Sequence, residues 1–220
     1  MEMFLDLDGP ILDVSKKYYR VYADLVYEFG GSPIIESEYW REKRNRTPIR
    51  DILSYSSVTD YEGYSSKRIE IIESLEYLKI DSTWPGTTEA LEKISGKSPL
   101  YLVTARRNRT NLIKQLEWLG ILDFFTSIIS PNDQELELPK NDLKKTMVWR
   151  ELGEVPLNGW FIGDTDTDTV AGNLLGLNTG VVVYGIRSEE IVLNYGADII
   201  FKMPTDFDAW VEKLFGEIND

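Results

Sequence analysis

The chain has 220 residues and a formal net charge of −13, and it contains neither histidine nor cysteine. This composition excludes Ser-His-Asp and Cys-His catalysis, thiolate metal sites and disulfide bonds. The acidic charge argues against general nucleic-acid binding. No apolar run is long enough to cross a membrane, and the first residues lack the basic and apolar regions of a signal peptide. We therefore expect a cytoplasmic protein with no nucleic-acid or membrane partner.

The predicted elements alternate between strands and helices over most of the chain. Six short apolar runs predict strands, at residues 3–5, 100–103, 127–129, 160–162, 180–184 and 198–201. Three segments between the later runs have helical spacing, at residues 111–119, 143–152 and 170–177. This alternation predicts an α/β fold with a doubly wound, Rossmann-like parallel sheet.

The segment from residue 14 to residue 82 interrupts the alternation. It has helical spacing throughout and no clear strand, with one apolar stripe from Tyr18 to Phe29 and a second from Ile69 to Leu78. We interpret it as an all-helical insert, so that residues 1–13 and 83–220 form the α/β core domain. An insert directly after the first strand is well placed to cover a crevice at the sheet.

A first acidic cluster, Asp6-Leu7-Asp8-Gly9, directly follows the first predicted strand. Carboxylates at the carboxyl ends of parallel strands converge on the crevice where α/β sheets bind ligands. One carboxylate there could bind a metal and attack a phosphate ester, giving an aspartyl-phosphate, while the other protonates the leaving oxygen. The alternative is an Asp-rich turn without chemistry, because the D-x-D-G pattern is weak by itself.

A second acidic cluster follows the strand at residues 160–162 and reads Gly163-Asp164-Thr165-Asp166-Thr167-Asp168. Asp164 or Asp168 alone could serve as a helix cap, but three acids within five residues exceed what a cap requires. An EF-hand is rejected, because the sixth loop position is Thr169 rather than Gly and the twelfth is Leu175 rather than Glu. Several carboxylates on one crevice favour a hard cation with oxygen ligands, namely Mg²⁺.

A phosphoryl group also requires hydrogen-bond donors and positive charge. Thr104 follows the strand at residues 100–103, so its hydroxyl and the neighbouring amide of Ala105 are candidates. Lys140 begins a predicted helix after Pro139 and is the candidate cation, with Lys144 and Lys145 as rivals one turn further on.

Together these motifs resemble those of the haloacid dehalogenase superfamily of phosphohydrolases. The matching segments are F-L-D-L-D-G, Y-L-V-T-A, P-K-N-D-L and F-I-G-D-T-D-T-D, and the resemblance covers nearly the whole chain. The segments W-P-G-T-T-E-A-L-E-K-I and A-G-N-L-L-G-L-N-T-G-V-V-V are similar to the phosphoglycolate-phosphatase-like branch. The resemblance implies a Rossmann-like core domain and a helical cap domain at residues 14–82.

The resemblance also implies the role of each site residue. Asp6 would be the phosphoryl-accepting nucleophile and Asp8 the general acid/base, which favours phosphatase over dehalogenase chemistry. Mg²⁺ would be held by Asp6, the Asp8 main-chain carbonyl and Asp164, with Asp168 in support. Thr104 and Lys140 would bind the phosphoryl group.

Three departures from the family pattern concern the turn, the phosphate loop and the lysine. Pro10 follows D-x-D-G where Thr, Val or Ser is usual, and Ala105 stands where many relatives have Asn or Gly. The spacing from Lys140 to the last motif is about one residue short, which leaves the identity of the lysine open.

The substrate predicted from these motifs is a small phosphorylated metabolite, bound by a monomer or homodimer. Arg44 and Arg46 of the insert are candidates to contact its anionic tail, although such a charge run usually faces solvent. Arg106, Arg107 and Arg109 of the core are alternatives. Two other functions stay open, namely a phosphomutase of the same superfamily and a non-catalytic binding module.

Overall fold

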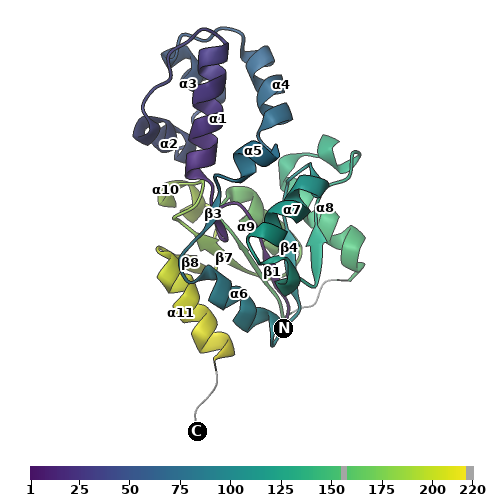
Figure 1. Cartoon of the computed structure of the whole chain (residues 1–220). Helices are drawn as coiled ribbons and strands as arrows, with labels where there is room; N and C mark the ends of the chain where they lie inside the picture. Colours follow the sequence, from purple (N-terminus) through teal and green to yellow (C-terminus); the bar gives the residue numbers. More distant parts are fainter. Residues whose placement is uncertain (155–157, 217–220) are drawn as a thin grey trace. The chain divides into compact units, whose positions relative to one another are not determined.

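The computed structural model describes residues 1–154 and 158–216 of the chain (Figure 1). The chain divides into two compact units. Unit 1 comprises Met1–Asp13 and Thr83–Asp220, and unit 2 comprises Val14–Ser82. None of the helices in the described ranges is long and apolar enough to span a membrane.

Unit 1 is built on a six-stranded parallel sheet with the order β5-β4-β1-β6-β7-β8. Its strands are β1 (Met3–Leu5), β4 (Leu100–Val103), β5 (Ser127–Ile129), β6 (Trp160–Gly163), β7 (Asn178–Val182) and β8 (Ile199–Phe201). From β1 the chain builds outward to β4 and β5 and then returns to the other side of β1 at β6. This reversal is the doubly wound arrangement, so the predicted fold class is confirmed.

The sheet of unit 1 is covered by helices on both faces. They are α6 (Thr87–Ser95), α7 (Arg109–Trp118), α8 (Lys140–Leu152), α9 (Asp166–Leu174), α10 (Glu189–Leu193) and α11 (Pro204–Phe215), with short 3₁₀ turns η1 (Leu122–Phe124) and η2 (Glu135–Glu137). On one face, α8 and α9 pack on the central strands; on the other, α6 contacts α11.

The two faces of the sheet follow from the alternation of side chains along each strand. Phe4, Tyr101 and Phe161 lie in the core beneath α8 and α9, and the Phe4 and Tyr101 rings stack with centroids 4.9 Å apart. On the opposite face, the Trp160 ring packs edge-on against Trp210 of α11 at 5.0 Å. Aromatic rings thus join neighbouring strands on one face of the sheet and join the sheet to α11 on the other.

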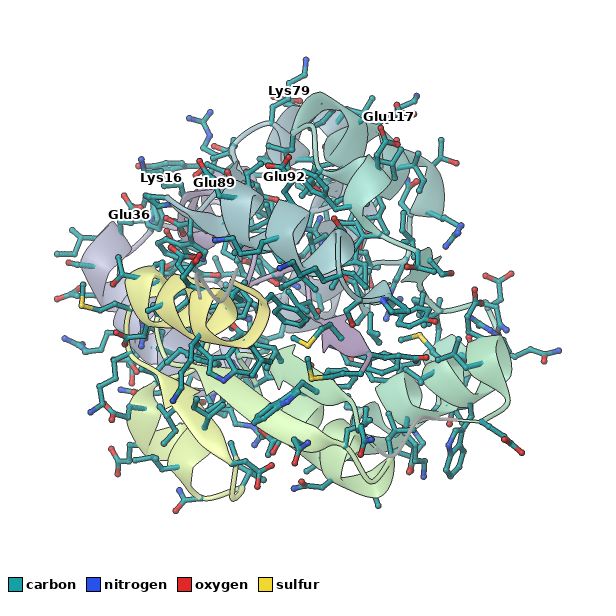
Figure 2. The ribbon with its side chains drawn as sticks, turned by 90° about the horizontal axis from the view of Figure 1, so that it is seen from below. Lys16, Glu36, Lys79, Glu89, Glu92 and Glu117 are labelled. Carbon is teal, nitrogen blue, oxygen red and sulfur yellow. The ribbon has the colours of Figure 1, made fainter. Side chains whose placement is uncertain are left out.

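Helix α6 is amphipathic, as its sequence requires. Leu91 and Ile94 are buried, whereas the exposed Glu89 and Glu92 project from its outer side (Figure 2). This division is the ordinary one for a helix that covers one side of a sheet.

Unit 2 is a helical domain. It contains α1 (Ser15–Glu28), α2 (Glu36–Arg44), α3 (Ile49–Tyr55), α4 (Tyr61–Ile71) and α5 (Leu75–Leu78). Its core is rich in tyrosine, and the Tyr22 and Tyr39 rings stack at 4.3 Å. The Tyr22 hydroxyl shares a hydrogen bond with Ser56. A buried ion pair joins Lys17 to Asp81 at 2.6 Å.

Three local details differ from the expectations. Strand β7 begins at Asn178 rather than residue 180, because its backbone pairs with β6 from Trp160 onward, whereas Val183 and Tyr184 lie beyond the strand. The expected stripe from residue 69 to residue 78 is split between α4 and α5, and its first member, Ile69, is 50% exposed. The strands β2 (Leu12–Asp13) and β3 (Ser82–Thr83), which were not predicted, form a separate two-stranded sheet.

Candidate active site

Three neighbouring strands of unit 1 end at the same edge of the sheet. Leu5 of β1 is in register with Leu102 of β4 on one side and with Ile162 of β6 on the other. Asp6 therefore begins the central loop of three, next to the loops that carry Thr104 and Asp164. This edge, where the strand order reverses, is the position at which α/β sheets bind ligands.

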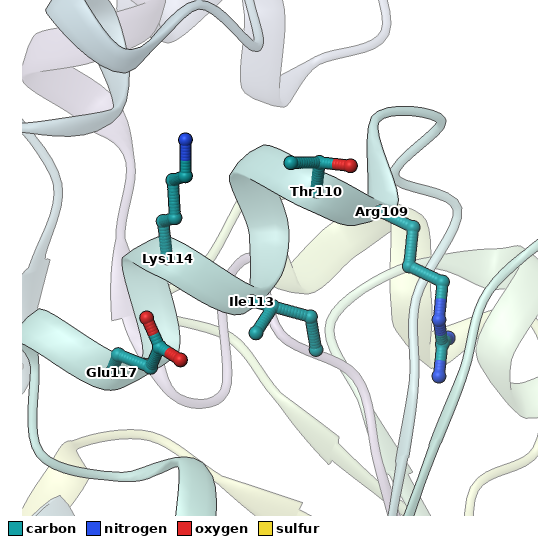
Figure 3. Close-up of a pocket in the computed structure, with 5 residues that line it drawn as sticks. All are labelled: Arg109, Thr110, Ile113, Lys114 and Glu117. Atoms are coloured by element: carbon teal, nitrogen blue, oxygen red, sulfur yellow. The ribbon is translucent and has the colours of Figure 1, made fainter.

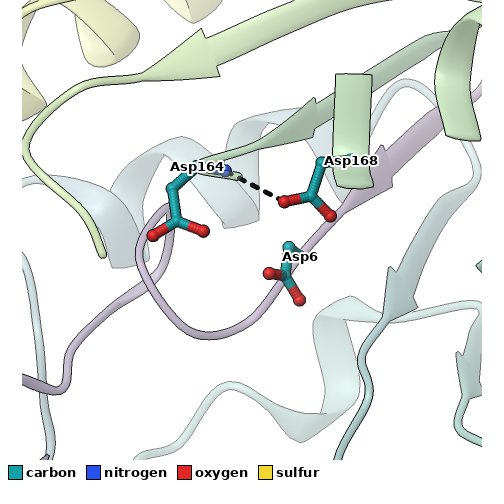
Figure 4. A group of neighbouring side chains, drawn as sticks. All are labelled: Asp6, Asp164 and Asp168. Atoms are coloured by element: carbon teal, nitrogen blue, oxygen red, sulfur yellow. Dashed lines mark hydrogen bonds between the residues drawn. The ribbon is translucent and has the colours of Figure 1, made fainter. Parts of the chain in front are cut away.

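The structure brings Asp6, Asp164 and Asp168 together, as Figure 4 shows. All three side chains are buried, and each offers a carboxylate oxygen within 4.8 Å of the others. Three carboxylates so close repel one another unless positive charge lies among them.

Asp168 is held in place by the start of helix α9. Its Oδ2 accepts hydrogen bonds from the main-chain N–H of Asp164 at 3.2 Å and of Thr165 at 2.9 Å. The Thr165 hydroxyl completes a capping box with it. Asp168 is thus both a helix cap and a member of the carboxylate cluster, so the two interpretations of this residue are not exclusive.

The cation of the cluster is Lys144, not the predicted Lys140. The Lys144 ammonium lies 2.9 Å from Oδ1 of Asp6 and also pairs with Oδ1 of Asp168. Lys144 is buried, whereas Lys140 is exposed at the first position of α8. Helical geometry gives the reason, because residues one turn apart lie on the same side of a helix but about 6 Å apart along its axis. Only Lys144 lies at the level of the carboxylates and contacts them. Lys145 instead pairs with Asp142 at 3.0 Å.

The electrostatics of the cluster show an excess of negative charge. Burial raises the pKa of Asp6 from 3.8 to about 7; Lys144 opposes this shift, and the Asp168 and Asp8 carboxylates reinforce it. Burial also raises the pKa of Asp164 well above its ordinary value, and Asp6 and Asp168 add to the effect. Burial alone would lower the pKa of Lys144, but the adjacent Asp168 and Asp6 raise it overall. One ammonium therefore does not offset three buried carboxylates.

The surroundings of Asp164 fit a divalent cation. Its Oδ2 accepts a hydrogen bond from the Ile186 N–H, whereas its Oδ1 is buried and accepts no hydrogen bond from the described residues. Gly9 and Gly185 lie against this carboxylate, and a Cβ atom at either position would overlap with it. The donors are all oxygens, which is the set that Mg²⁺ prefers.

Asp8 lies at the same edge but forms a different interaction. Both of its carboxylate oxygens accept hydrogen bonds from Arg106, from Nε at 3.0 Å and from Nη2 at 2.6 Å. The loop that carries Asp8 is fixed by Trp84, whose indole Nε1–H donates to the Gly9 carbonyl at 2.7 Å. Asp8 is thus an ordered carboxylate beside the cluster.

The predicted phosphate loop has a defined backbone. Thr104 is buried, and its N–H donates to the Ile129 carbonyl at 3.0 Å. Its hydroxyl oxygen accepts a hydrogen bond from the Arg106 N–H at 3.3 Å, and the intervening Ala105 is exposed. Arg44 ends α2 and Arg46 lies in the turn after it, both in unit 2, and their role in substrate binding stays a prediction.

A surface pocket along α7 is separate from the carboxylates. It is lined by Arg109, Thr110, Ile113, Lys114 and Glu117, which all belong to this one helix (Figure 3). The pocket contains no residue of the carboxylate cluster, so the candidate active site is the edge at β4, β1 and β6.

Comparison with known proteins decides the family. The profile of the family described as haloacid dehalogenase-like hydrolase matches residues 3–182. The chain belongs to this family. The match spans both acidic clusters, the Thr104 loop and Lys144, so the resemblance of the motifs is confirmed at the level of the family.

Individual relatives agree with this hydrolase family. The chain is 26% identical over 212 residues to the pyrophosphatase PpaX of Halalkalibacterium halodurans, with 93% of each chain covered. A hydrolase of the same family from Streptococcus pneumoniae has a similar structure, with a TM-score of 0.76, 22% identity and coverage of 95% and 97%. A candidate β-phosphoglucomutase from Thermotoga maritima reaches a TM-score of 0.72 at 22% identity, with coverage of 97% and 100%. At such identities the structural likenesses establish the fold alone.

Sequence reasoning left the identity of the lysine open and missed two contacts of this edge. Lys144 was a rival to Lys140, and the helical phase of α8 does not separate the two, because both lie on the side of the helix that carries Met147. The pairing of Arg106 with Asp8 has no local signal, because it joins loops from two different strands. The approach of Gly185 to Asp164 likewise depends on the path of the chain after β7.

Proposed function

We propose that this hydrolase is a magnesium-dependent phosphatase that acts on a small phosphorylated metabolite through an aspartyl-phosphate on Asp6. The observation that carries the proposal is the group of three buried carboxylates with the Lys144 ammonium at the carboxyl edge of the sheet. A phosphoryl group needs a nucleophile, a hard cation and further positive charge at one place. Asp6 can supply the nucleophile, the three carboxylates can bind the cation, and Lys144 supplies the further positive charge.

In the proposed site, Mg²⁺ is held by Asp6, Asp164 and the main-chain carbonyl of Asp8, with Asp168 in support. The buried Oδ1 of Asp164, without a donor among the described residues, supports this assignment. When bound, the ion neutralises charge on the carboxylates and on the phosphoryl oxygens. Asp168 fixes the α9 end of the site through its hydrogen bonds to the main chain.

The chemistry proceeds in two displacements. A carboxylate oxygen of Asp6 attacks phosphorus, the bond from phosphorus to the leaving oxygen breaks, and Asp8 donates a proton to that oxygen. In the second step Asp8 accepts a proton from water, and the water oxygen attacks phosphorus. The bond between phosphorus and the Asp6 oxygen breaks, which releases phosphate and restores the Asp6 carboxylate. Lys144 takes the phosphate-binding role first assigned to Lys140, together with the Thr104 hydroxyl and the Ala105 amide.

Unit 2 has the composition expected of a cap domain, and we propose that it serves as one. Caps of this kind exclude water and contribute to substrate choice by opening and closing. Arg44 and Arg46 stay candidates for contact with an anionic substrate tail. A cytoplasmic location also stays a prediction.

A diphosphate substrate is the second candidate, and the relatives favour it. The PpaX pyrophosphatases of two organisms are similar to this chain over 91–93% of its length, at 19–26% identity. Inorganic diphosphate has a phosphoryl group and a phosphate leaving group, so the same two displacements would hydrolyse it.

The test is the release of inorganic phosphate from p-nitrophenyl phosphate, from inorganic diphosphate and from a panel of phosphorylated metabolites. We expect release with Mg²⁺ and none after chelation. Asp6→Asn should abolish it on every substrate. Interconversion of sugar phosphates without phosphate release would indicate the phosphomutase instead, and a protein inert towards all of these substrates would indicate a binding module.

A further inference from the structure

The ion pair between Asp8 and Arg106 is partly buried and has a specific geometry. Nε and Nη2 of the guanidinium contact the two carboxylate oxygens at 3.0 and 2.6 Å. The Arg106 side chain is 6% exposed and the Asp8 side chain 15%. A guanidinium that binds a carboxylate in this forked way is equally suited to two oxygens of a phosphate.

The backbone holds Arg106 at the reacting end of the site. Its N–H donates to the hydroxyl of Thr104, the proposed phosphate-binding residue two positions earlier. Its side chain reaches Asp8, the residue proposed to serve the leaving oxygen. Arg106 therefore lies on the side from which the leaving group departs.

Catalysis by Asp8 disturbs this ion pair. When an oxygen of Asp8 turns to the leaving oxygen, the fork loses at least one of its two contacts. A buried guanidinium is less stable when its contact with an anionic oxygen is weakened. A leaving group without charge cannot replace the contact, whereas a leaving group with its own anionic oxygens can.

We propose that Arg106 is a specificity-determining residue that binds an anionic leaving group, so that phosphoanhydrides such as inorganic diphosphate are preferred to simple phosphate monoesters. The inference rests on the proposed phosphatase function and deepens it. It predicts that the Arg106 side chain exchanges the Asp8 carboxylate for phosphate oxygens of the substrate.

The experiment compares kcat/KM for inorganic diphosphate and for glycerol 3-phosphate, whose leaving group is an uncharged alcohol, both with Mg²⁺, in the wild type and in variants. Arg106→Gln should reduce the ratio of diphosphate to alkyl phosphate by roughly 10- to 100-fold, mainly through KM, because hydrogen bonds between charged groups are lost on one substrate. Arg106→Lys keeps a cation without the fork, and we expect an intermediate ratio. Lys97→Gln is the control for loss of a positive charge, since Lys97 is exposed and precedes β4, at the opposite end of that strand from Thr104, and its ratio should equal that of the wild type.

The following results would overturn the inference that Arg106 binds the leaving group. An equal loss on both substrates in Arg106→Gln would mean that Arg106 only positions Asp8, while the phosphatase function stands. If circular dichroism shows that Arg106→Gln does not fold, Arg106→Lys decides, and an unchanged ratio there contradicts the proposal. A wild-type protein that hydrolyses neither substrate would contradict both the proposed phosphatase function and this inference.

Discussion

Lys144 and Asp6, from α8 and the end of β1, form an ion pair in which Nζ lies 2.9 Å from Oδ1. The same ammonium contacts Asp168, so one cation joins both acidic clusters of the chain. In the proposed mechanism Lys144 binds the phosphoryl oxygens while it also offsets the charge of the nucleophile.

Replacement of Lys144 by Met should therefore abolish most of the activity. We expect kcat on p-nitrophenyl phosphate to fall by roughly 10²- to 10³-fold, which is typical for loss of one charge-stabilising group in an active site. Lys140→Met is the control, because Lys140 belongs to the same helix but is exposed. A severe loss in Lys140→Met with little change in Lys144→Met would reinstate the original assignment.

The assignment of Lys144 illustrates how far the sequence alone carries the site. Asp6 and Asp164 were predictable because each lies at the end of an apolar run, and parallel strands align their carboxyl ends. Asp168 was predictable because it lies four residues after Asp164, near the start of a helix. The lysine was not, because Lys140 and Lys144 lie on the same side of α8 one turn apart, and the sequence pattern does not show which turn lies beside the carboxylates. The fold class followed from the alternation of strands and helices, whereas the start of β7 depended on its pairing with β6, which the apolar pattern of residues 178–184 does not show.

Gly185 provides a test of the metal assignment. In Gly185→Ala the added Cβ would overlap with the Asp164 carboxylate, so that side chain must move. We expect a weaker affinity for Mg²⁺, measured as a rise of about 10-fold or more in the Mg²⁺ concentration that gives half-maximal activity.

Gly96→Ala is a suitable control for this change. Its Cβ would lie 3.4 Å from the nearest atom, the Glu92 carbonyl oxygen, which is ordinary contact. An unaltered Mg²⁺ dependence in Gly185→Ala would argue that Asp164 does not bind the metal.

The pH dependence of metal-free stability follows from the raised pKa of Asp6. Its folded-state pKa is about 7 against an ordinary value of 3.8, so the folded protein binds more protons between these values than the unfolded chain. The contribution of Asp6 to the stability of the fold is therefore complete below its ordinary pKa of 3.8, and it is lost as the pH rises through the folded-state pKa of about 7. The raised pKa of Asp164 acts in the same direction.

Mg²⁺ should reverse this loss, because it binds the deprotonated carboxylates. We expect the rise in Tm on addition of Mg²⁺ to be larger at about pH 8 than at about pH 5.5. Thermal unfolding with and without the ion measures this effect. An equal rise in Tm at both pH values would show that Asp6 and Asp164 do not bind the Mg²⁺ ion.

The Lys17–Asp81 pair should be important for the stability of unit 2. Both side chains are almost completely buried, at 1% and 0% exposure, so Asp81→Asn removes the carboxylate charge that faces a buried ammonium. Breaking such a pair costs about 3–5 kcal/mol, which urea unfolding can measure.

The exposed pair of Arg20 and Asp24 is the matched control for this measurement. It lies on the same helix as Lys17, with 65% of the arginine side chain exposed, and we expect no measurable change in the free energy of unfolding for Arg20→Gln. A double variant, Lys17→Met with Asp81→Leu, should recover much of the stability lost in Asp81→Asn. Equal effects at the buried and the exposed pair would contradict the account.

The most direct test of the account is the detection of a covalent phosphoryl group on Asp6. The protein is incubated with Mg²⁺ and a substrate that it hydrolyses, quenched in acid within the turnover time, digested and analysed by mass spectrometry. We predict a phosphorylated peptide that contains Asp6, and its absence in Asp6→Asn. Turnover of the substrate with no phosphoryl group on that peptide, or with one on another residue, would contradict the central claim.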